Sequence, residues 1–166
     1  MQSLRPFPVV VTVAGEDFEI PAMTAADWLT LLMVPNLDPF DVFPGLLDDD
    51  DVSTLLAGDL SMAEFEQVAV DVITTASARS WWVALRLISV ARDSWDVVGA
   101  EMGLKGVDAT KMSLSGWLDI LLLLVLRNLD PKDVQMFTMK LENPPPGMGE
   151  SEEPTMSAEA FMAMAG

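Results

Sequence analysis

The sequence that decides the fold is Trp117-Leu-Asp-Ile-Leu-Leu-Leu-Leu-Val-Leu-Arg-Asn128, which would be apolar on nearly every side of a helix. Its unbroken apolar run covers the seven residues 120–126, between Asp119 and Arg127. A membrane-spanning helix needs about 20 residues, so this run is too short to cross a bilayer. A short helix that is apolar all round is expected at the centre of a bundle. The stretch therefore predicts a mainly helical fold arranged around it.

Helix boundaries are predicted on both sides of this stretch. Ser113 or Ser115 can begin its helix, because a serine oxygen accepts hydrogen bonds from the first backbone N–H groups. Beyond its end, Asp130-Pro131 combines an N-cap acid with a proline at the first helical position. A last core helix is therefore expected, and its buried face would consist of Val134, Phe137 and Leu141.

Upstream of the central stretch, residues 104–112 show little pattern and are predicted to form a linker. Before the linker, apolar residues recur at helical spacing and predict one helix that ends at Gly103. Its expected buried stripe is Trp81, Ala84, Leu85, Ile88, Ala91, Trp95, Val98 and Met102. Trp82 points about 100° away from Trp81, so it contacts a neighbouring helix or lies at an interface, where Trp is enriched. Core packing is the favoured interpretation of this pair.

A further helix is predicted to begin at Ser61. Ser61 and Glu64 have the spacing of a capping box, in which each side chain bonds to the backbone N–H of the other residue. Apolar residues then fall on one helical face. They are Met62, Phe65, Ala69, Val72, Ile73 and Ala76.

The N-terminal part predicts a β-hairpin followed by a helix. Residues 8–14 are rich in Val and Thr, and 18–20 resume the apolar pattern after a turn around Gly15. An isolated hairpin is marginally stable, so it must lie on helices or pair with another strand. Thr24 and Asp27 then form an acidic capping box, and Pro35 ends the helix. The buried face of that helix would consist of Trp28, Leu29, Leu31 and Leu32.

Two acidic segments follow this helix. Asp38-Pro39 predicts a short helix limited by Pro44-Gly45. The four aspartates at 48–51 form a loop or the first turn of a short helix through Leu56. Their carboxylates could bind Ca²⁺ or act in paired-carboxylate catalysis. Because the run lacks the alternating spacing and closing Glu of an EF-hand loop, a solvated acidic face is the favoured interpretation.

The composition changes at Asn143. Three prolines at 144–146 are followed by glycines and a Glu-rich stretch through Pro154, which is typical of a flexible tail. Within it, residues 157–165 can form a turn or two of helix. The sequence thus predicts a mainly α protein, a helical bundle with a small N-terminal β-hairpin (about 8–20) and a flexible C-terminal tail. The single α-rich domain would cover 1–142, and the Pro/Glu/Met-rich tail 143–166.

The charge of the chain excludes several kinds of partner. It carries 26 acidic and 9 basic residues, a formal net charge of −17. Residues 1–60 hold 11 acids and one base, Arg5, and residues 143–166 hold four acids and no base. Proteins that bind nucleic acids or anionic membranes use Lys and Arg for the phosphates, so neither partner is expected. A protein with a basic or mixed surface would be attracted instead.

The sequence lacks the residues of the common nucleophile–base pairs, which leaves only Lys or a carboxylate as a possible base. There is no Cys and no His, so disulfides and Ser–His or Cys–His pairs are excluded. No lysine stands in a Ser-x-x-Lys motif, and no Gly-rich phosphate loop follows a strand. We therefore expect no enzyme activity, no catalytic site, no cofactor and no metal.

Two short stretches of the sequence resemble a known protein family. Phe-Glu-Ile-Pro-Ala-Met-Thr-Ala-Ala-Asp-Trp-Leu at 18–29 follows the Val-rich hairpin, and Asp-Val-Phe-Pro-Gly-Leu-Leu at 41–47 precedes an acidic helical body. With the Pro/Glu tail, this layout over residues 8–142 resembles the tail assembly chaperones of long-tailed, siphovirus-type phages that infect actinobacteria.

The resemblance implies a protein of viral tail assembly. It would bind the tape measure protein, help to recruit tail tube protein and act by protein–protein binding without catalysis. It would work in the host cytoplasm and be absent from the mature virion. The alternatives are a structural virion protein of the head–tail or tail-tip region, or an acidic DNA mimic that inhibits a nucleic-acid enzyme.

Candidate partner-binding residues follow from exposure and composition. A Val-rich strand offers an unpaired edge, and the chain is rich in flexible Met toward its C-terminus, so we expect a homo-oligomer. The candidate partner-binding residues are Val9, Val11, Val13, Trp82, Met136, Met139, Phe161 and Met162. The residues expected to dominate the core are Trp28, Phe65, Trp81, Leu85, Ile88, Trp95, Trp117 and residues 121–125.

Overall fold

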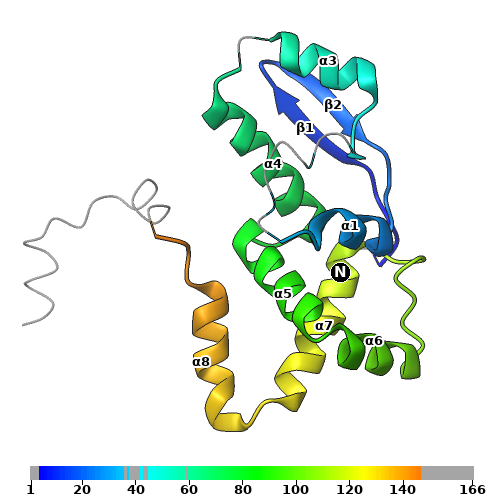
Figure 1. Cartoon of the computed structure of the whole chain (residues 1–166), viewed down its shortest axis with the longest axis vertical. Helices are drawn as coiled ribbons and strands as arrows, with labels where there is room; N and C mark the ends of the chain where they lie inside the picture. The colour runs from blue at the N-terminus through cyan, green and yellow to red at the C-terminus, as the bar shows by residue number, and fades with distance from the viewer. Residues whose placement is uncertain (1–3, 36, 38–41, 43–44, 59, 147–166) are drawn as a thin grey trace, which may run out of the picture.

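The helices of the chain pack against one another and carry a two-stranded hairpin at one end (Figure 1). The structure is a computed structural model, and it describes residues 4–35, 37, 42, 45–58 and 60–146. Within these ranges it contains seven helices with defined bounds and one two-stranded antiparallel sheet. The predicted mainly helical fold with an N-terminal hairpin is confirmed. The short helix expected after Asp38-Pro39 and most of the tail lie outside the described residues.

The hairpin consists of β1 (Val9–Val13) and β2 (Glu16–Ile20). The strands pair antiparallel, with Val11 opposite Phe18. Ala14 and Gly15 turn the chain with positive φ angles of 51° and 84°, a turn whose twist suits a hairpin. One face of the hairpin packs on α4 (Met62–Ser77) and buries Val9, Val11, Val13, Phe18 and Ile20. The hairpin is therefore stabilised by a helix, as an isolated hairpin requires.

Local capping sets the starts of the first helices. Before α1 (Ala25–Leu32), the Asp27 carboxylate accepts a hydrogen bond from the Thr24 N–H at 3.0 Å. Before α4, the Glu64 carboxylate accepts one from the Ser61 N–H at 2.8 Å. Both predicted capping boxes are confirmed. The aspartate run begins α3 (Asp49–Ala57), because Asp48 accepts a hydrogen bond from the Asp51 N–H at 2.8 Å.

The single helix predicted over 81–102 is wrong. The chain forms α5 (Trp81–Asp93) and α6 (Trp95–Leu104), with a bend at Ser94, where φ is −125° and ψ is 30°. Polar residues occupy the bend, and the Trp95 ring lies against Trp117 of α7 (Leu114–Asn128), with ring centroids 6.4 Å apart. The apolar spacing continues through the bend, so the helical pattern alone did not reveal it. Trp95 is 46% exposed instead of buried.

Helix α7 begins at the expected cap, since the Ser113 hydroxyl accepts a hydrogen bond from the Gly116 N–H at 3.1 Å. It packs on α1, α4 and α5, which places much of it in the core. One side of α7 is open: Leu121 and Leu124 are buried, whereas Leu123 is 67% exposed. The prediction that the whole of 121–125 is core is therefore only partly right. The helix that packs on the most other helices is α5, which contacts α1, α4, α6, α7 and α8 (Pro131–Glu142).

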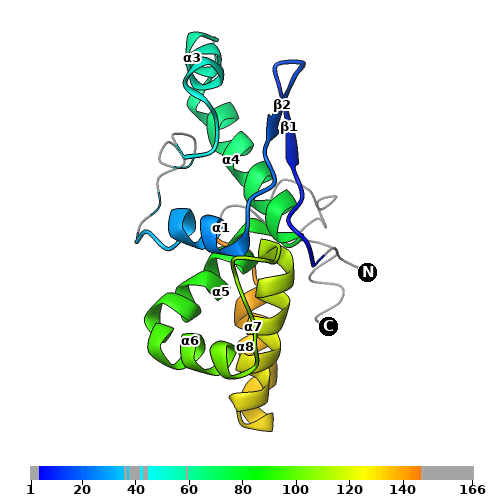
Figure 2. The same ribbon diagram turned by 90° about the vertical axis from the view of Figure 1, so that its right-hand side faces the viewer.

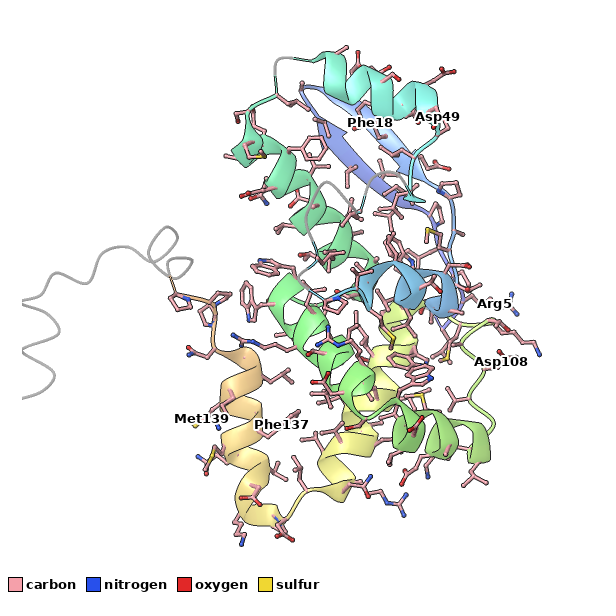
Figure 3. The ribbon with its side chains drawn as sticks, viewed as in Figure 1. Arg5, Phe18, Asp49, Asp108, Phe137 and Met139 are labelled. Carbon is pink, nitrogen blue, oxygen red and sulfur yellow. The ribbon has the colours of Figure 1, made fainter. Side chains whose placement is uncertain are left out.

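The other core predictions have mixed outcomes. Trp28, Phe65, Ile88 and Trp117 are buried as expected. Trp81 and Leu85 are half-buried, because the buried face of α5 is rotated from the predicted stripe. That face consists of Val83, Ala84, Leu87, Ile88 and Ala91. On α8, Leu141 is buried and Phe137 is half-buried on the side that faces α5 (Figure 3).

Candidate partner-binding surface

Helix α6 is an apolar helix that lies at the surface. Its sequence, Trp-Asp-Val-Val-Gly-Ala-Glu-Met-Gly-Leu, places apolar residues on all sides, but Met102 is the residue of α6 that is fully buried. Val97 is 64% exposed and Leu104 is 89% exposed. A helix that is apolar all round is normally buried in a core or a membrane. The exposed side of α6 is therefore a candidate contact surface.

A groove runs between α6 and α7, which lie side by side in Figure 2. One of its two cavities holds about 190 Å³ and has mainly apolar walls, and the other, near the end of α6, holds about 310 Å³. Glu101 and Asn128 line both cavities, which are therefore adjacent, and we refer to them together as the α6–α7 groove. Its apolar walls come from Val90, Val97, Val98, Leu121, Leu124, Val125 and Leu129.

The end of the groove beside Leu104, which we call its open end, has an excess of positive charge. Leu104, Lys105 and Arg127 line this end together with Glu101. Lys105 caps α6 and Arg127 lies in the last turn of α7, where the helix dipole favours cations. Among the described side chains, neither base forms an ion pair with an acid. In a chain of net charge −17, this end of the groove is therefore a local region of positive charge.

A second hollow, of about 370 Å³, lies between the start of α5, the middle of α7 and the end of α8. Val83, Leu122, Leu126 and Leu141 form its apolar walls. Arg79, at its edge, pairs with Asp119 of α7. The Arg79 Nε atom is buried without a hydrogen-bond partner among the described residues. We refer to this hollow as the α7–α8 notch.

The predicted strand contact needs a correction. The side chains of Val9, Val11 and Val13 are buried, because this face of β1 packs on α4. They are therefore not available to a partner. A partner at β1 would instead meet the outward-facing side chains, Val10 and Thr12, and the backbone edge of the strand.

The other predicted contact residues fall on α5 and α8 or outside the described ranges. Trp82 is half-buried and contacts a neighbouring helix: its indole N–H donates to the Glu142 carbonyl of α8 at 3.2 Å. Met136 and Met139 are exposed on α8, and Figure 3 shows Met139 pointing away from the side that carries Phe137. Phe161 and Met162 lie outside the described residues.

Sequence reasoning missed the α6–α7 groove. The available signal was the position of Val97 and Leu104, two apolar residues that lie off the predicted stripe and are seven residues apart. Two residues at that spacing share one side of a helix. Because the predicted helix ends at Gly103, Leu104 falls in the predicted linker, and Val97 alone does not indicate a second apolar side.

The acidic groups with shifted pKa values belong to turns and caps. Hydrogen bonds from Ser61 to Glu64 lower the pKa of that carboxyl. The Thr110 hydroxyl, with help from Lys111, lowers the pKa of Asp108 to about 2. In the described part of the chain, no three or more Asp or Glu residues are grouped so as to hold a metal ion. These carboxylates therefore have structural roles in the segments that they cap.

No helix within the described ranges is long and apolar enough to cross a membrane. Comparisons with known proteins found no matching family model, no similar curated protein and no similar solved structure.

Proposed function

We propose that this protein acts by binding another protein, as a phage tail assembly chaperone that holds the tape measure protein and assists tail tube assembly. The observation that carries the proposal is the exposed apolar helix α6 beside the α6–α7 groove, in a chain of net charge −17. Exposed apolar surface with a charged rim is typical of protein-binding sites. The layout that resembles tail assembly chaperones supports the same function.

The partner that suits this groove is an amphipathic helix. Val97 and Leu104 lie two turns apart on α6, a rise of about 10 Å, so they can contact apolar residues that recur every seven positions in a client helix. Lys105 and Arg127 would then bind an acidic residue at the end of that apolar stretch. No catalytic step is needed for this role.

The remaining surface suits a holding protein. High net charge keeps a protein soluble while it carries an apolar client. The protein would act in the host cytoplasm during assembly and be absent from the mature virion. It would also form a homo-oligomer, whose contacts include the exposed edge of the hairpin.

The first test is capture of coexpressed tape measure protein by variants of the full chain. We expect Leu104→Asp to weaken capture by about tenfold or more, because a charge in an apolar contact costs upward of about 1.4 kcal/mol. Leu123→Asp is the matched control, since Leu123 is also an exposed leucine but lies outside the groove lining. If only Leu123→Asp loses capture, the client binds the other side of α7 and not the groove. Absence of capture by the unaltered chain would refute the proposed function.

The second test separates a chaperone from a structural component. Mass spectrometry of purified phage particles should detect tail tube protein and little of this protein. A high copy number in mature particles would contradict the chaperone role and favour a structural protein of the head–tail or tail-tip region.

A further inference from the structure

We infer that the α6–α7 groove is occupied in the free protein by residues 157–165 of the same chain. The segment reads Ser-Ala-Glu-Ala-Phe-Met-Ala-Met-Ala, with three large apolar side chains and one acid. This inference rests on the proposed function only in taking the groove as a docking surface. It adds that a client helix must displace a segment that the protein itself supplies.

The chemistry of the segment matches that of the groove. Phe161, Met162 and Met164 supply apolar contacts, and unbranched Met side chains adapt to irregular apolar walls. Glu159 supplies one negative charge beside them, and the open end of the groove supplies Lys105 and Arg127. The whole of 143–166 carries four acids and no base, so most of the acidic surface of the chain repels it.

The length of the chain beyond α8 allows the segment to reach the groove. Helix α8 begins just after Asn128 and Leu129 of the groove lining, and its 12 residues carry the chain about 18 Å away. The ten residues 147–156 can span up to about 35 Å when extended, which is enough to return past the length of α8. A short tether of this kind gives a millimolar effective concentration, which favours the chain's own segment over that of a second copy.

Docking of the chain's own segment in the groove lowers the apparent affinity of the groove for a client. If the segment fills the groove in nine of ten molecules, the apparent affinity for a client falls by about tenfold. Phe161→Asp should remove the main apolar anchor of the segment and raise client capture by up to about that factor. Leu104→Asp has the opposite effect on capture, because it damages the groove itself.

The absence of cysteine from the sequence permits a direct test on the full chain. An Ala165→Cys variant can carry one nitroxide spin label, whose unpaired electron broadens the NMR signals of nearby methyl groups. We expect broadening at Val97, Leu104 and Val125 and none at the hairpin valines Val9 and Val13. Adding Leu104→Asp should abolish the broadening, whereas adding Leu123→Asp should preserve it, with the hairpin signals of both variants reporting an intact fold.

Each other outcome of this experiment overturns the inference. Groove signals that stay sharp would show that the segment does not dock there. Broadening that moves to Leu122 and Leu126 would place the segment in the α7–α8 notch. If the groove signals of protein without a spin label broaden to the same extent when spin-labelled protein is mixed with it, a second copy supplies the segment. Failure of the proposed function is distinguishable, because the spin-label experiment contains no client.

Discussion

Helices α6 and α7 have a similar composition and opposite surroundings. Both carry apolar residues on nearly all sides, but α7 packs on α1, α4 and α5, whereas α6 packs on α5 near the end of the bundle. Seven residues of α7 are buried and one residue of α6 is buried. An apolar helix is buried only when enough other elements pack around it, so the position of the helix in the fold decides whether the need for burial is met. Where it is not met, as at Val97 and Leu104, apolar surface stays exposed.

The sharpest test of this comparison uses the same substitution in both helices. Leu118 is fully buried in α7 and Leu104 is almost fully exposed in α6. We expect Leu118→Ala to lower the free energy of unfolding by about 2–5 kcal/mol, because it removes buried methyl groups and leaves a cavity. Leu104→Ala should change it by less than about 0.5 kcal/mol. Urea unfolding of both variants measures the two effects, and equal losses would show that α6 belongs to the core.

A second test extends the comparison to α8, which packs on α5 as α6 does but is also held by polar contacts. The Arg86 guanidinium donates to the carbonyls of Lys140, Leu141 and Asn143, at 2.7, 3.0 and 2.5 Å. Arg86→Ala should lower the free energy of unfolding by about 1–3 kcal/mol, because these carbonyls at the end of α8 lose a charged donor.

The readout of this substitution is amide hydrogen exchange in 131–142, which should become faster in Arg86→Ala. Arg92→Ala is the control, since Arg92 forms an exposed pair with Asp93 that is worth about 0–1 kcal/mol. Unchanged exchange in α8 after loss of Arg86 would show that apolar contacts alone hold the helix.

The smallest expected effect lies in the linker between the two compared helices. Thr110 and Lys111 hold the pKa of Asp108 at about 2, below the ordinary value of 3.8. The ionised carboxylate therefore favours the folded linker above about pH 3.8, and this contribution is lost as the pH falls toward 2. Thr110→Val should raise the pKa of Asp108 toward 3.8, because it removes the hydroxyl donor. A carboxyl carbon NMR titration measures the shift, and an unaltered midpoint would assign the effect to Lys111.

The features predicted correctly from the sequence are those set by neighbours a few residues away. The capping boxes at Thr24 and Ser61 and the cap at Ser113 depend on residues three positions along, so the sequence contains the whole interaction. The hairpin turn at Gly15 is equally local.

The features predicted wrongly depend on contacts between distant segments. The bend at Ser94 accompanies packing of Trp95 against Trp117, 22 residues away, while the helical spacing of apolar residues continues through it. The burial of Val9, Val11 and Val13 depends on α4 lying across β1. The groove was missed for the same reason, because its two walls come from α6 and α7.

The attachment of α8 to α5 also determines how the molecule would bear mechanical load. A body that pulls on the residues after 146 applies tension first at Asn143. There the Arg86 guanidinium and the Trp82 indole hold four successive carbonyls, those of residues 140–143. The tension would therefore pass from Asn143 directly into the first half of α5, and from α5 to the helices that surround it. The C-terminal end of α8 would therefore stay attached to α5 under this load. An object tethered to the C-terminal segment would pull on α5, the helix that packs on the most other helices.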